Sequence, residues 1–364
     1  MSLLAGAAPA APPRPGRAVR RLTAGSQDRT WVSALAFLLV AEVVYFSVTV
    51  SGFWGGGTGM LSLSEQFLDI GLIALGETLV ILAGEIDLSA GAMSSLVGIV
   101  MAELWQQGLN IWVATALALL VGALGGALNG LLVTRFGIDS LLVTLATQFI
   151  LSSVATALGG GSPPYGFPKS FVNLAGTGTI GPVPYQLIAF AVIATVTGLG
   201  VSRTRYGRGL VLTGYNRAAA RYSGTNVRRT LLWSFIASGF LAGLSGVMVS
   251  GFYNAARDDI GDSLLLPAIT VVVLGGVDIF GGRGRVLGVV VATFVLGLLT
   301  QGLLVAGDSS LTATMVTGIV LVMCLVLKIM LNRRSGASLR QLLARRFGPM
   351  TRPPPTRLGG ETTS

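Results

Sequence analysis

The stretch IWVATALALLVGALGGALNGLLV, residues 111–133, decides the fold class because no charged side chain interrupts it. About 20 mostly apolar residues cross the hydrocarbon core of a bilayer as a helix, and buried helices of soluble domains are usually shorter. Stretches of similar composition occur on both sides of it. We therefore predict an all-α, polytopic integral membrane protein with about ten transmembrane helices, at residues 31–50, 65–83, 88–105, 111–133, 141–158, 183–201, 231–252, 264–280, 286–305 and 311–331.

The positive charge of the loops supports this arrangement and gives its orientation. If the N-terminus lies inside and the spans alternate, all but two of the 25 basic residues face the cytoplasm, and only Lys169 and Arg257 face outward. Transmembrane orientation follows the Lys/Arg bias of the loops. We therefore expect both termini in the cytoplasm, since one missed or invented span would scramble the segregation.

Composition excludes several classes of protein. Charged residues make up 11% of the chain, against roughly 25% in soluble domains. The net charge of +10 reflects positive loops that attract anionic lipid headgroups, so we expect membrane lipid as a partner and no nucleic acid. With no histidine and one cysteine, Cys324, the chain has no disulfide and none of the usual zinc or haem sites. We expect no metal and no cofactor.

The predicted organisation has three parts. Residues 1–30 are rich in Ala, Pro and Arg, which predicts a disordered cytoplasmic tail. Residues 31–331 form the transmembrane domain, and the segment 202–230 is its long cytoplasmic loop. Residues 332–364 form a basic cytoplasmic tail, which begins with an Arg-rich amphipathic stretch suited to the inner leaflet.

Glycines at helical spacing predict close helix packing. In lipid, small residues that let two backbones approach are a main source of helix association. Two of the predicted spans carry such stripes, formed by Gly122, Gly126 and Gly130 in one and by Gly239 and Gly243 in the other.

Polar residues inside the spans are candidates for a solute path, because such residues are costly in lipid and normally face a bundle interior. They are Glu77, Thr78, Asn129, Thr144 and Gln148. The alternative is that the Thr and Gln side chains only bond neighbouring helices or their own backbone. An acid among apolar residues is a functional candidate by default, so Glu77 carries the most weight.

Two similar turns follow predicted spans: GEIDLSAG at residues 84–91 and GGVDIFGG at residues 275–282. The likeness fits either a duplication or chance. Glycines around an Asp permit local unwinding, and the first turn has almost no loop beside it, which predicts a broken helix there. Asp87 and Ser89 could then line the solute path, or Asp87 could only cap the next span. The second turn, followed by Arg283 and Arg285, is expected to end a span at the cytoplasmic surface.

The loop 202–230 also allows two interpretations. Asn216 could cap a short helix through RAAARY, residues 217–222, that Gly224 ends. Such a helix could be offered to a cytoplasmic partner. Alternatively, the segment is a basic loop that obeys the positive-inside rule.

These segments resemble the permease subunits of bacterial carbohydrate ABC importers of the ribose/galactose/xylose type. The stretch VILAGEIDLSAG, residues 80–91, is similar to a V-I-L-x-G-G-I-D-L-S-V-G motif of that family. The family's run of glycines near the end is similar to the Ala268–Ile269 and Gly275–Gly288 segment. The loop residues that match the family's pattern are Thr204, Gly207, Arg208, Gly214, Asn216, Ala219, Ala220, Arg221, Ser223 and Gly224.

Some positions depart from the common family pattern. Glu85 replaces the second Gly of the first motif, and Leu265 and Pro267 stand where many members carry acids. Together with the outer-loop sequence GFP at residues 166–168, these departures resemble the rhamnose or autoinducer-2 branch more than the ribose branch.

The resemblance implies an import permease of the bacterial cytoplasmic (inner) membrane that carries a sugar or sugar-like solute. Its implied partners are a second permease subunit, identical or homologous, two cytoplasmic ATP-binding subunits and an outer solute-binding protein. The chain itself is not expected to be an enzyme, since its lysines, Lys169 and Lys328, lie outside any phosphate-binding loop. The alternative is a self-contained proton-coupled secondary transporter with Glu77 or Asp87 as the titrating acid.

Overall fold

The computed structural model describes residues 17–50, 53, 63–160, 163–320, 322, 323 and 326. The chain divides into two compact units, Met1–Thr317 and Gly318–Ser364, and the arrangement below is that of the first. Residues 1–16, the predicted tail 332–364 and Cys324 lie outside the described residues.

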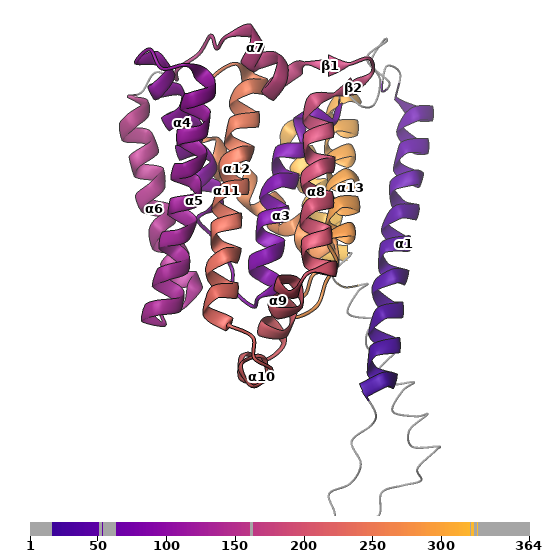
Figure 1. The fold of residues 1–364 in the computed structure, drawn as a ribbon. Helices are drawn as coiled ribbons and strands as arrows, with labels where there is room; N and C mark the ends of the chain where they lie inside the picture. Colours follow the sequence, from indigo (N-terminus) through magenta and orange to yellow (C-terminus); the bar gives the residue numbers. More distant parts are fainter. Residues whose placement is uncertain are drawn as a thin grey trace, which may run out of the picture. The chain divides into compact units, whose positions relative to one another are not determined.

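Helices make up most of the described residues of the first unit (Figure 1). A short antiparallel pair, β1 (Thr179–Ile180) with β2 (Val183–Pro184), and brief helical turns join them. The brief turns are the 3₁₀ turn η2 (Ser64–Gln66), α7 (Lys169–Phe171) and the π-helical turn η3 (Val172–Thr177). The longer helices are α1 (Arg17–Thr49), α3 (Leu68–Leu82), α4 (Ala90–Gln106), α5 (Ile111–Phe136), α6 (Ser140–Gly159), α8 (Tyr185–Arg203), α9 (Arg205–Tyr215), α10 (Arg217–Tyr222), α11 (Val227–Tyr253), α12 (Ile260–Leu274) and α13 (Val286–Val305).

Within the described residues, 6 helices are long and apolar enough to cross a membrane: Thr30–Thr49 of α1, and α5, α6, α8, α11 and α13. The other four predicted spans, 65–83, 88–105, 264–280 and 311–331, correspond to shorter helices. These are α3, α4, α12 and an apolar helix at Ser310–Val320. The count of ten spans therefore stays a prediction.

Several predicted spans differ from the observed helices at their ends, and three of these differences have a clear backbone cause. Span 65–83 is not one helix, because Phe67, with φ of −143°, separates η2 from α3. Span 264–280 ends early, at Leu274, where Gly276 takes a φ of 91° that no helix continues. Span 183–201 begins at Tyr185, since Pro184 holds an extended conformation at the end of β2. Helix α1 conversely extends into the predicted tail, to Arg17.

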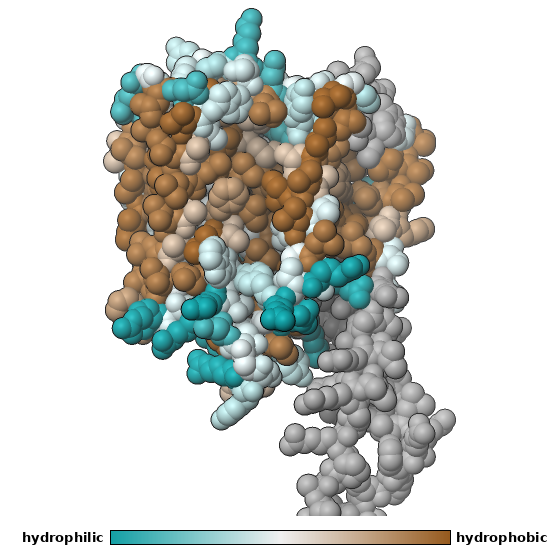
Figure 2. Space-filling model, in the orientation of Figure 1, coloured by the Kyte–Doolittle hydropathy of each residue, from teal (hydrophilic) through white to brown (hydrophobic). Residues whose placement is uncertain are grey.

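Helix α3 occupies the interior of the bundle. All of its residues except Asp69 and Ile70 are buried, because α11, α12, α13 and α8 pack around it. The outer helices α5, α6 and α8 instead expose rows of Leu, Val and Phe, which form the apolar band in Figure 2. A helix that is apolar on all sides belongs inside a bundle, and an apolar outer face belongs against lipid.

The most extensive helix contact, between α5 and α11, runs through the predicted glycine stripes. A Cβ built on Gly126 would overlap the carbonyl oxygen of Phe235, and one on Gly122 would lie 2.7 Å from the carbonyl oxygen of Gly239. Gly130 faces Leu232 in the same row, and Gly243 faces Val97 of α4. The two backbones are therefore in direct contact, and any side chain at Gly126 or Gly239 would force them apart.

Helix α1 packs on α12 and α13. The indole Nε1 of Trp31 donates to the carbonyl oxygen of Leu274, 2.7 Å away, at the end of α12. Near the last turn of α1, the ring of Phe46 occupies the space beside Gly302 of α13. These contacts attach α1 to the bundle at its middle and near its last turn.

The arginines of the segment from α8 to α11 gather at one end of the bundle, below the apolar band in Figure 2. We call this the basic end. It carries Arg203, Arg205, Arg208, Arg217, Arg221, Arg228 and Arg229. The predicted loop 202–230 is mostly helical here, because α9 precedes the short helix α10 that the sequence predicts.

Candidate functional site

The connection between α3 and α4, residues 83–89, is not helical. Helix α3 ends at Leu82, and two residues later Gly84, with φ of 82°, turns the chain while its amide donates to Ile81 O at 2.9 Å. Helix α12 ends in the same way at Leu274, two residues before Gly276, which has φ of 91°. When the two helix ends are superposed in sequence, Gly84 corresponds to Gly276. The likeness between residues 84–91 and 275–282 instead aligned Gly84 with Gly275, so the two alignments differ by one residue. Asp87 and Asp278 therefore do not occupy equivalent positions after their helices.

Asp87 is the centre of a buried hydrogen-bond network. Its Oδ1 accepts from the amide of Ser89 at 3.0 Å and from Ser89 Oγ at 2.6 Å. Its Oδ2 accepts from Ser238 Oγ of α11 at 3.0 Å. Asn129 Nδ2 of α5 donates to Ser89 Oγ at 2.8 Å. We call Asp87, Ser89, Asn129 and Ser238 the Asp87 network; it joins the connection to α5 and α11, and each member is at most 1% exposed.

This network lies well inside the bundle. Ser238 comes eleven residues after the first residue of α11, which places it about 16 Å along that helix. Asn129 comes seven residues before Phe136, the last residue of α5, or about 10 Å from its end. Non-helical backbone at membrane depth is tolerated where protein surrounds it, and Figure 1 shows α4 and α11 beside this connection.

Polar side chains of α6 bond the backbone of the connection. The amide of Ile86 donates to Ser140 Oγ at 3.3 Å, and Thr144 Oγ1 lies 3.3 Å from the carbonyl oxygen of Ile86. Thr144 also donates to Ser140 O at 2.8 Å. Gln148 is half-buried one turn further along α6, outside the hydrogen bonds of the Asp87 network.

Glu77 differs from these residues because its carboxylate is buried next to the Asp87 backbone amide but outside strict hydrogen-bond geometry. It is fully buried in α3, it interacts electrostatically with Asp87, and among the described residues neither oxygen has a hydrogen-bond partner. The neighbouring Thr78 donates to Ala74 O at 2.6 Å within its own helix. Asn129 Oδ1 is a second buried acceptor without a partner in the described part of the chain. Two unused acceptors therefore adjoin the Asp87 network.

At the basic end, α10 is capped as the sequence predicts. Asn216 Oδ1 accepts from the amide of Ala219 at 2.9 Å, and Gly224, with φ of 79°, follows the helix. Ala220 is fully buried, while Ala219 and Arg221 are exposed. Helix α9 begins with a similar cap, in which Thr204 Oγ1 accepts from the amide of Gly207 at 3.1 Å.

One ion pair joins α10 to the connection between α3 and α4. Arg217 Nη2 bonds Glu85 Oε1 in a short contact. The carboxylate is buried and the guanidinium is about half exposed. Burial raises the pKa of Glu85, and the attraction of Arg217 opposes that rise. Since Glu85 and Asp87 are two residues apart, this pair connects the basic end to the Asp87 network.

Glycines let three chain segments meet beside this pair. The amide of Gly282, after α12, donates to the carbonyl oxygen of Leu82, at the end of α3, at 2.9 Å. A Cβ on Gly214 of α9 would overlap the same carbonyl oxygen, and one on Gly281 would lie 2.7 Å from Gly84 Cα. We call Gly84, Gly214, Gly281 and Gly282 the glycine junction. Because no side chain separates them, a displacement of α9 acts directly on the end of α3.

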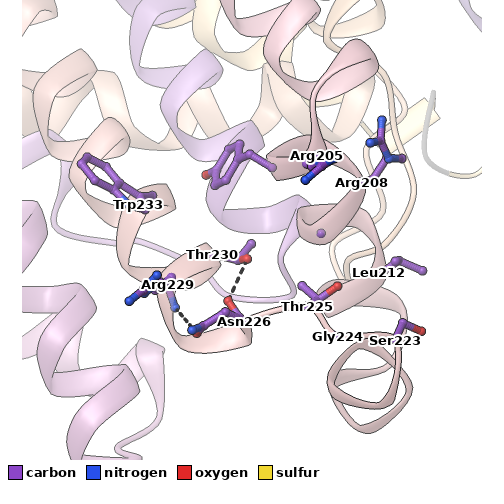
Figure 3. Close-up of a pocket in the computed structure, with 12 residues that line it drawn as sticks. Arg205, Arg208, Leu212, Ser223, Gly224, Thr225, Asn226, Arg229, Thr230 and Trp233 are labelled. Carbon is purple, nitrogen blue, oxygen red and sulfur yellow. Dashed lines mark hydrogen bonds between the residues drawn. The ribbon is translucent and has the colours of Figure 1, made fainter.

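A cavity of about 530 Å³ opens at the basic end between α9 and α11 (Figure 3). Arg205, Arg208 and Leu212 of α9 line one side of it, and Arg229 and Trp233 of α11 line the other. Tyr206 Oη and Ser234 Oγ lie 3.0 Å apart and join the two helices. In the described part of the chain, no group of three or more His, Cys, Asp or Glu side chains could hold a metal ion.

The comparisons with known proteins fit this architecture. Residues 59–325 match the family described as branched-chain amino acid transport system / permease component. This chain belongs to that family. It is therefore a transport permease of the cytoplasmic membrane and not an enzyme.

Individual relatives match 80–82% of this chain. This chain is 36% identical over 302 residues to the autoinducer 2 import system permease protein LsrD of Yersinia enterocolitica. The match covers 81% of this chain and 91% of the relative. The protein of the same name from Klebsiella pneumoniae is 36% identical over 298 residues, 80% and 89% of the two chains. That of Salmonella paratyphi A is 34% identical over 303 residues, 82% and 91%. The resemblance to carbohydrate-importer permeases and their autoinducer-2 branch is confirmed.

Sequence reasoning missed three parts of this permease's site. Ser238 and Ser140 were not candidates, although each is a hydroxyl in an apolar helix that faces the connection. Glu85 was noted only as a departure from a motif. Two sequence features could have paired Glu85 with Arg217. Glu85 is an acid beside a glycine at the end of an apolar span, and Arg217 is the first residue of a capped helix.

Proposed function

We propose that this permease is the membrane subunit of an ABC importer and forms half of the path for a sugar-like solute. An outer binding protein delivers the solute, and ATP-binding subunits dock at the basic end, which faces the cytoplasm. The relatives named for autoinducer 2 import support a small polyhydroxylated solute of that kind. The main support for this proposal is the ion pair between Arg217 and Glu85, because it joins α10 at the basic end to the segment that holds the Asp87 network.

The Asp87 network has the chemistry to bind hydroxyl groups. A carboxylate accepts several hydrogen bonds, and such charged acceptors contribute about 1.5–3 kcal/mol each. Glu77 and Asn129 Oδ1 add acceptors without partners among the described residues. A solute hydroxyl could donate to these atoms or replace Ser238 on Asp87. Thr78, Thr144 and Gln148 would then only hold the surrounding helices, as the bonds of Thr78 and Thr144 to helix carbonyls favour.

Movement of α10 would reach this network through two contacts. The ion pair pulls on Glu85, and the glycine junction lets α9 push on the end of α3. Both act on the segment that holds Asp87. Docked ATP-binding subunits would therefore open or close the path by displacing α9 and α10 together.

The decisive experiment compares Asp87 with Asp278 in proteoliposomes that contain the complete importer. Each Asp accepts a bond from the amide two residues later, Asp278 from Phe280 N at 3.1 Å. Only Asp87 also bonds Ser238 of another helix. We expect Asp87→Asn to abolish uptake while solute-independent ATP hydrolysis remains, and Asp278→Asn to transport normally. Uptake by both variants at wild-type rates would show that Asp87 is only a turn-forming residue.

One observation favours a second function, a proton-coupled secondary transporter. Glu77 is a buried acid without a hydrogen-bond partner among the described residues, and intramembrane acids often carry protons. The purified permease alone, in liposomes with an imposed pH gradient, would then accumulate solute. Under the importer proposal it does not, and uptake requires the ATP-binding subunits. Loss of pH-driven uptake in Glu77→Gln would identify the proton-carrying group.

A further inference from the structure

Helix α1 supplies the last hydrogen bond at the end of α12. A helix leaves its last four carbonyl oxygens without partners of its own. In α12 the first three of them accept from the amides of residues 275–277, and the fourth, Leu274 O, accepts from Trp31 Nε1 at 2.7 Å. The indole also covers Gly276, since a Cβ there would lie 2.9 Å from Trp31 Cδ1. Trp31 therefore holds both the last residue of α12 and the backbone that turns away from it.

Glycines bring the start of α13 to the same point. A Cβ on Gly288 would overlap the carbonyl oxygen of Gly275, and it would lie 3.4 Å from Val32 Cγ2 of α1. A Cβ on Gly275 would in turn lie 2.6 Å from Val289 Cα. The end of α12, the start of α13 and the part of α1 around Trp31 are therefore in direct contact. The turn that joins α12 to α13 starts from this fixed base.

The turn itself, residues 275–285, is closed by its own hydrogen bonds. The amide of Asp278 donates to Arg283 O, and the amide of Gly281 donates to Asp278 O, both at 2.9 Å. The amide of Phe280 donates to Asp278 Oδ1 at 3.1 Å. Coupling between distant parts of a protein is carried by packed, rigid elements of this kind. A constraint on the start of the turn therefore also constrains its far end.

The far end of the turn belongs to the glycine junction. The amide of Gly282 donates to Leu82 O of α3, and a Cβ on Gly282 would lie 2.6 Å from Tyr215 N, at the end of α9. The junction therefore has three sides: the end of α3, the end of α9 and the turn held by Trp31. A free turn would give way before α9, and less of the displacement would reach α3. A turn held in place leaves the end of α3 as the side that moves.

We propose that Trp31 is a positioning residue for transport: by holding the turn after α12, it directs the displacement of α9 onto the end of α3. This role rests on the proposed function, in which ATP-binding subunits displace α9 and α10. It adds α1 to that pathway, although α1 lies outside the residues 59–325 that match the family. Trp31 acts on α3 through the turn, so its loss should reduce the efficiency of transport more than the stability of the fold.

The first measurement follows the turn in the wild-type permease, within the complete importer in proteoliposomes. Pairs of spin labels, in a background without the native cysteine, report distances by pulsed electron paramagnetic resonance. A pair at Phe280 and Asp308 measures the turn against the opposite end of α13, and a pair at Ala218 and Asp308 measures α10 against the same point. All three side chains are exposed. Trapping with ATP and vanadate should change the Ala218–Asp308 distance and leave the Phe280–Asp308 distance constant.

The wild-type permease alone can overturn the proposal. If both distances change by the same amount, the turn follows α9 and is not held in place. If neither distance changes, ATP-binding subunits do not displace α10, and the coupling step of the proposed function is refuted together with the role of Trp31. The two failures are therefore distinguishable without any substitution at Trp31.

The second measurement compares two substitutions in α1. Trp31→Phe keeps an aromatic ring but removes the N–H donor to Leu274 O. We expect uptake per ATP hydrolysed to fall about threefold to fivefold, because one hydrogen bond shifts an equilibrium by about that factor. The Phe280–Asp308 distance should then change on trapping. Phe46→Leu is the matched control, because Phe46 packs beside Gly302, about 20 Å along α13 from Gly288. It should keep the wild-type uptake per ATP.

Two results from these variants would also overturn the proposal. An equal fall in both variants would show that Trp31 only attaches α1 to the bundle. Wild-type uptake per ATP in Trp31→Phe, with a constant Phe280–Asp308 distance, would show that α13 holds the turn without α1. Circular dichroism and size-exclusion elution check that both variants fold.

Discussion

The ion pair between Arg217 and Glu85 gives the sharpest quantitative prediction, because its two partners differ in burial. The Glu85 side chain is 7% exposed and that of Arg217 is 48% exposed. Removing one partner of a buried pair is destabilising by about 3–5 kcal/mol, whereas exposed pairs contribute about 0–1 kcal/mol. This pair is intermediate between the two cases.

The two single substitutions should therefore be unequal. Arg217→Gln leaves a buried carboxylate without its cation, so we expect a loss of about 2 kcal/mol in the free energy of unfolding. Glu85→Gln leaves a half-exposed guanidinium in contact with water, and we expect a loss of about 1 kcal/mol. The double variant should lose less than the sum of the two. SDS titration of the purified permease in mixed micelles measures all four free energies.

The same pair predicts a dependence on pH. Burial raises the pKa of Glu85 above its ordinary value of 4.5, and Arg217 opposes this rise. A carboxyl with a raised folded-state pKa contributes stability that is fully present below pH 4.5 and is lost as pH rises through the folded-state pKa. Arg217→Gln removes the opposing attraction, so the pKa of Glu85 rises further in this variant. The deficit of Arg217→Gln against wild type should therefore shrink as the pH is lowered.

Two results would refute this reasoning. Equal losses for the two single substitutions would show that the difference in burial has no energetic effect. A deficit of Arg217→Gln that stays constant from about pH 8 to pH 5 would show that Glu85 does not gain a proton when its partner is removed. A solvent-exposed pair, Arg257 with Asp259, serves as the control, and its disruption should change stability far less than Arg217→Gln does.

Three other predictions concern topology, packing and coupling. In a background without the native cysteine, a cysteine at Ser170 should react with an impermeant reagent in intact cells, and one at Ala218 should not; external labelling of Ala218 would contradict the cytoplasmic placement of α10. Gly126→Ala should lower unfolding free energy by about 1–3 kcal/mol because its Cβ meets backbone, whereas Gly200→Ala meets nothing within 4 Å and should be neutral or stabilising; equal effects would show that α5 and α11 do not pack as described. Ala220→Asp buries a charge and should reduce ATP-driven uptake strongly, while the exposed Ala218→Asp should not; similar uptake by both would remove α10 from the coupling pathway.

Much of this fold could be predicted because apolar composition alone is enough to identify a helix that is solvated by the bilayer. Residues 286–305 agree with α13 at both ends, since Arg285 before them and Gly307 after them are strong boundaries. The capped helix at Asn216 was predictable because capping depends on a few neighbouring residues. The breaks near Phe67 and at Leu274 were missed, because apolar side chains continue past both points while the backbone turns.

The candidate site was less predictable because its partners are far apart in sequence. Glu77, Asp87 and Asn129 could be chosen as polar residues in apolar surroundings, yet their distances depend on how α5 and α11 pack. Ser238 and Glu85 needed that packing to be recognised at all. The two interpretations of Asp87, path residue and helix cap, also overlap in the structure, because one carboxylate oxygen bonds the Ser89 amide while the other bonds Ser238.

The buried connection between α3 and α4 has a consequence for how the protein is made. Asp87 finds its partner Ser238 only 151 residues later in the chain. At about 5–20 residues per second, the ribosome needs roughly 8–30 s to reach that serine. During this interval the newly inserted segment has polar groups that the later helices will bond, so it requires water, lipid headgroups or an insertase in their place. A permease whose synthesis is truncated before α11 should therefore fail to fold at α3–α4, and this segment should be cleaved by proteases.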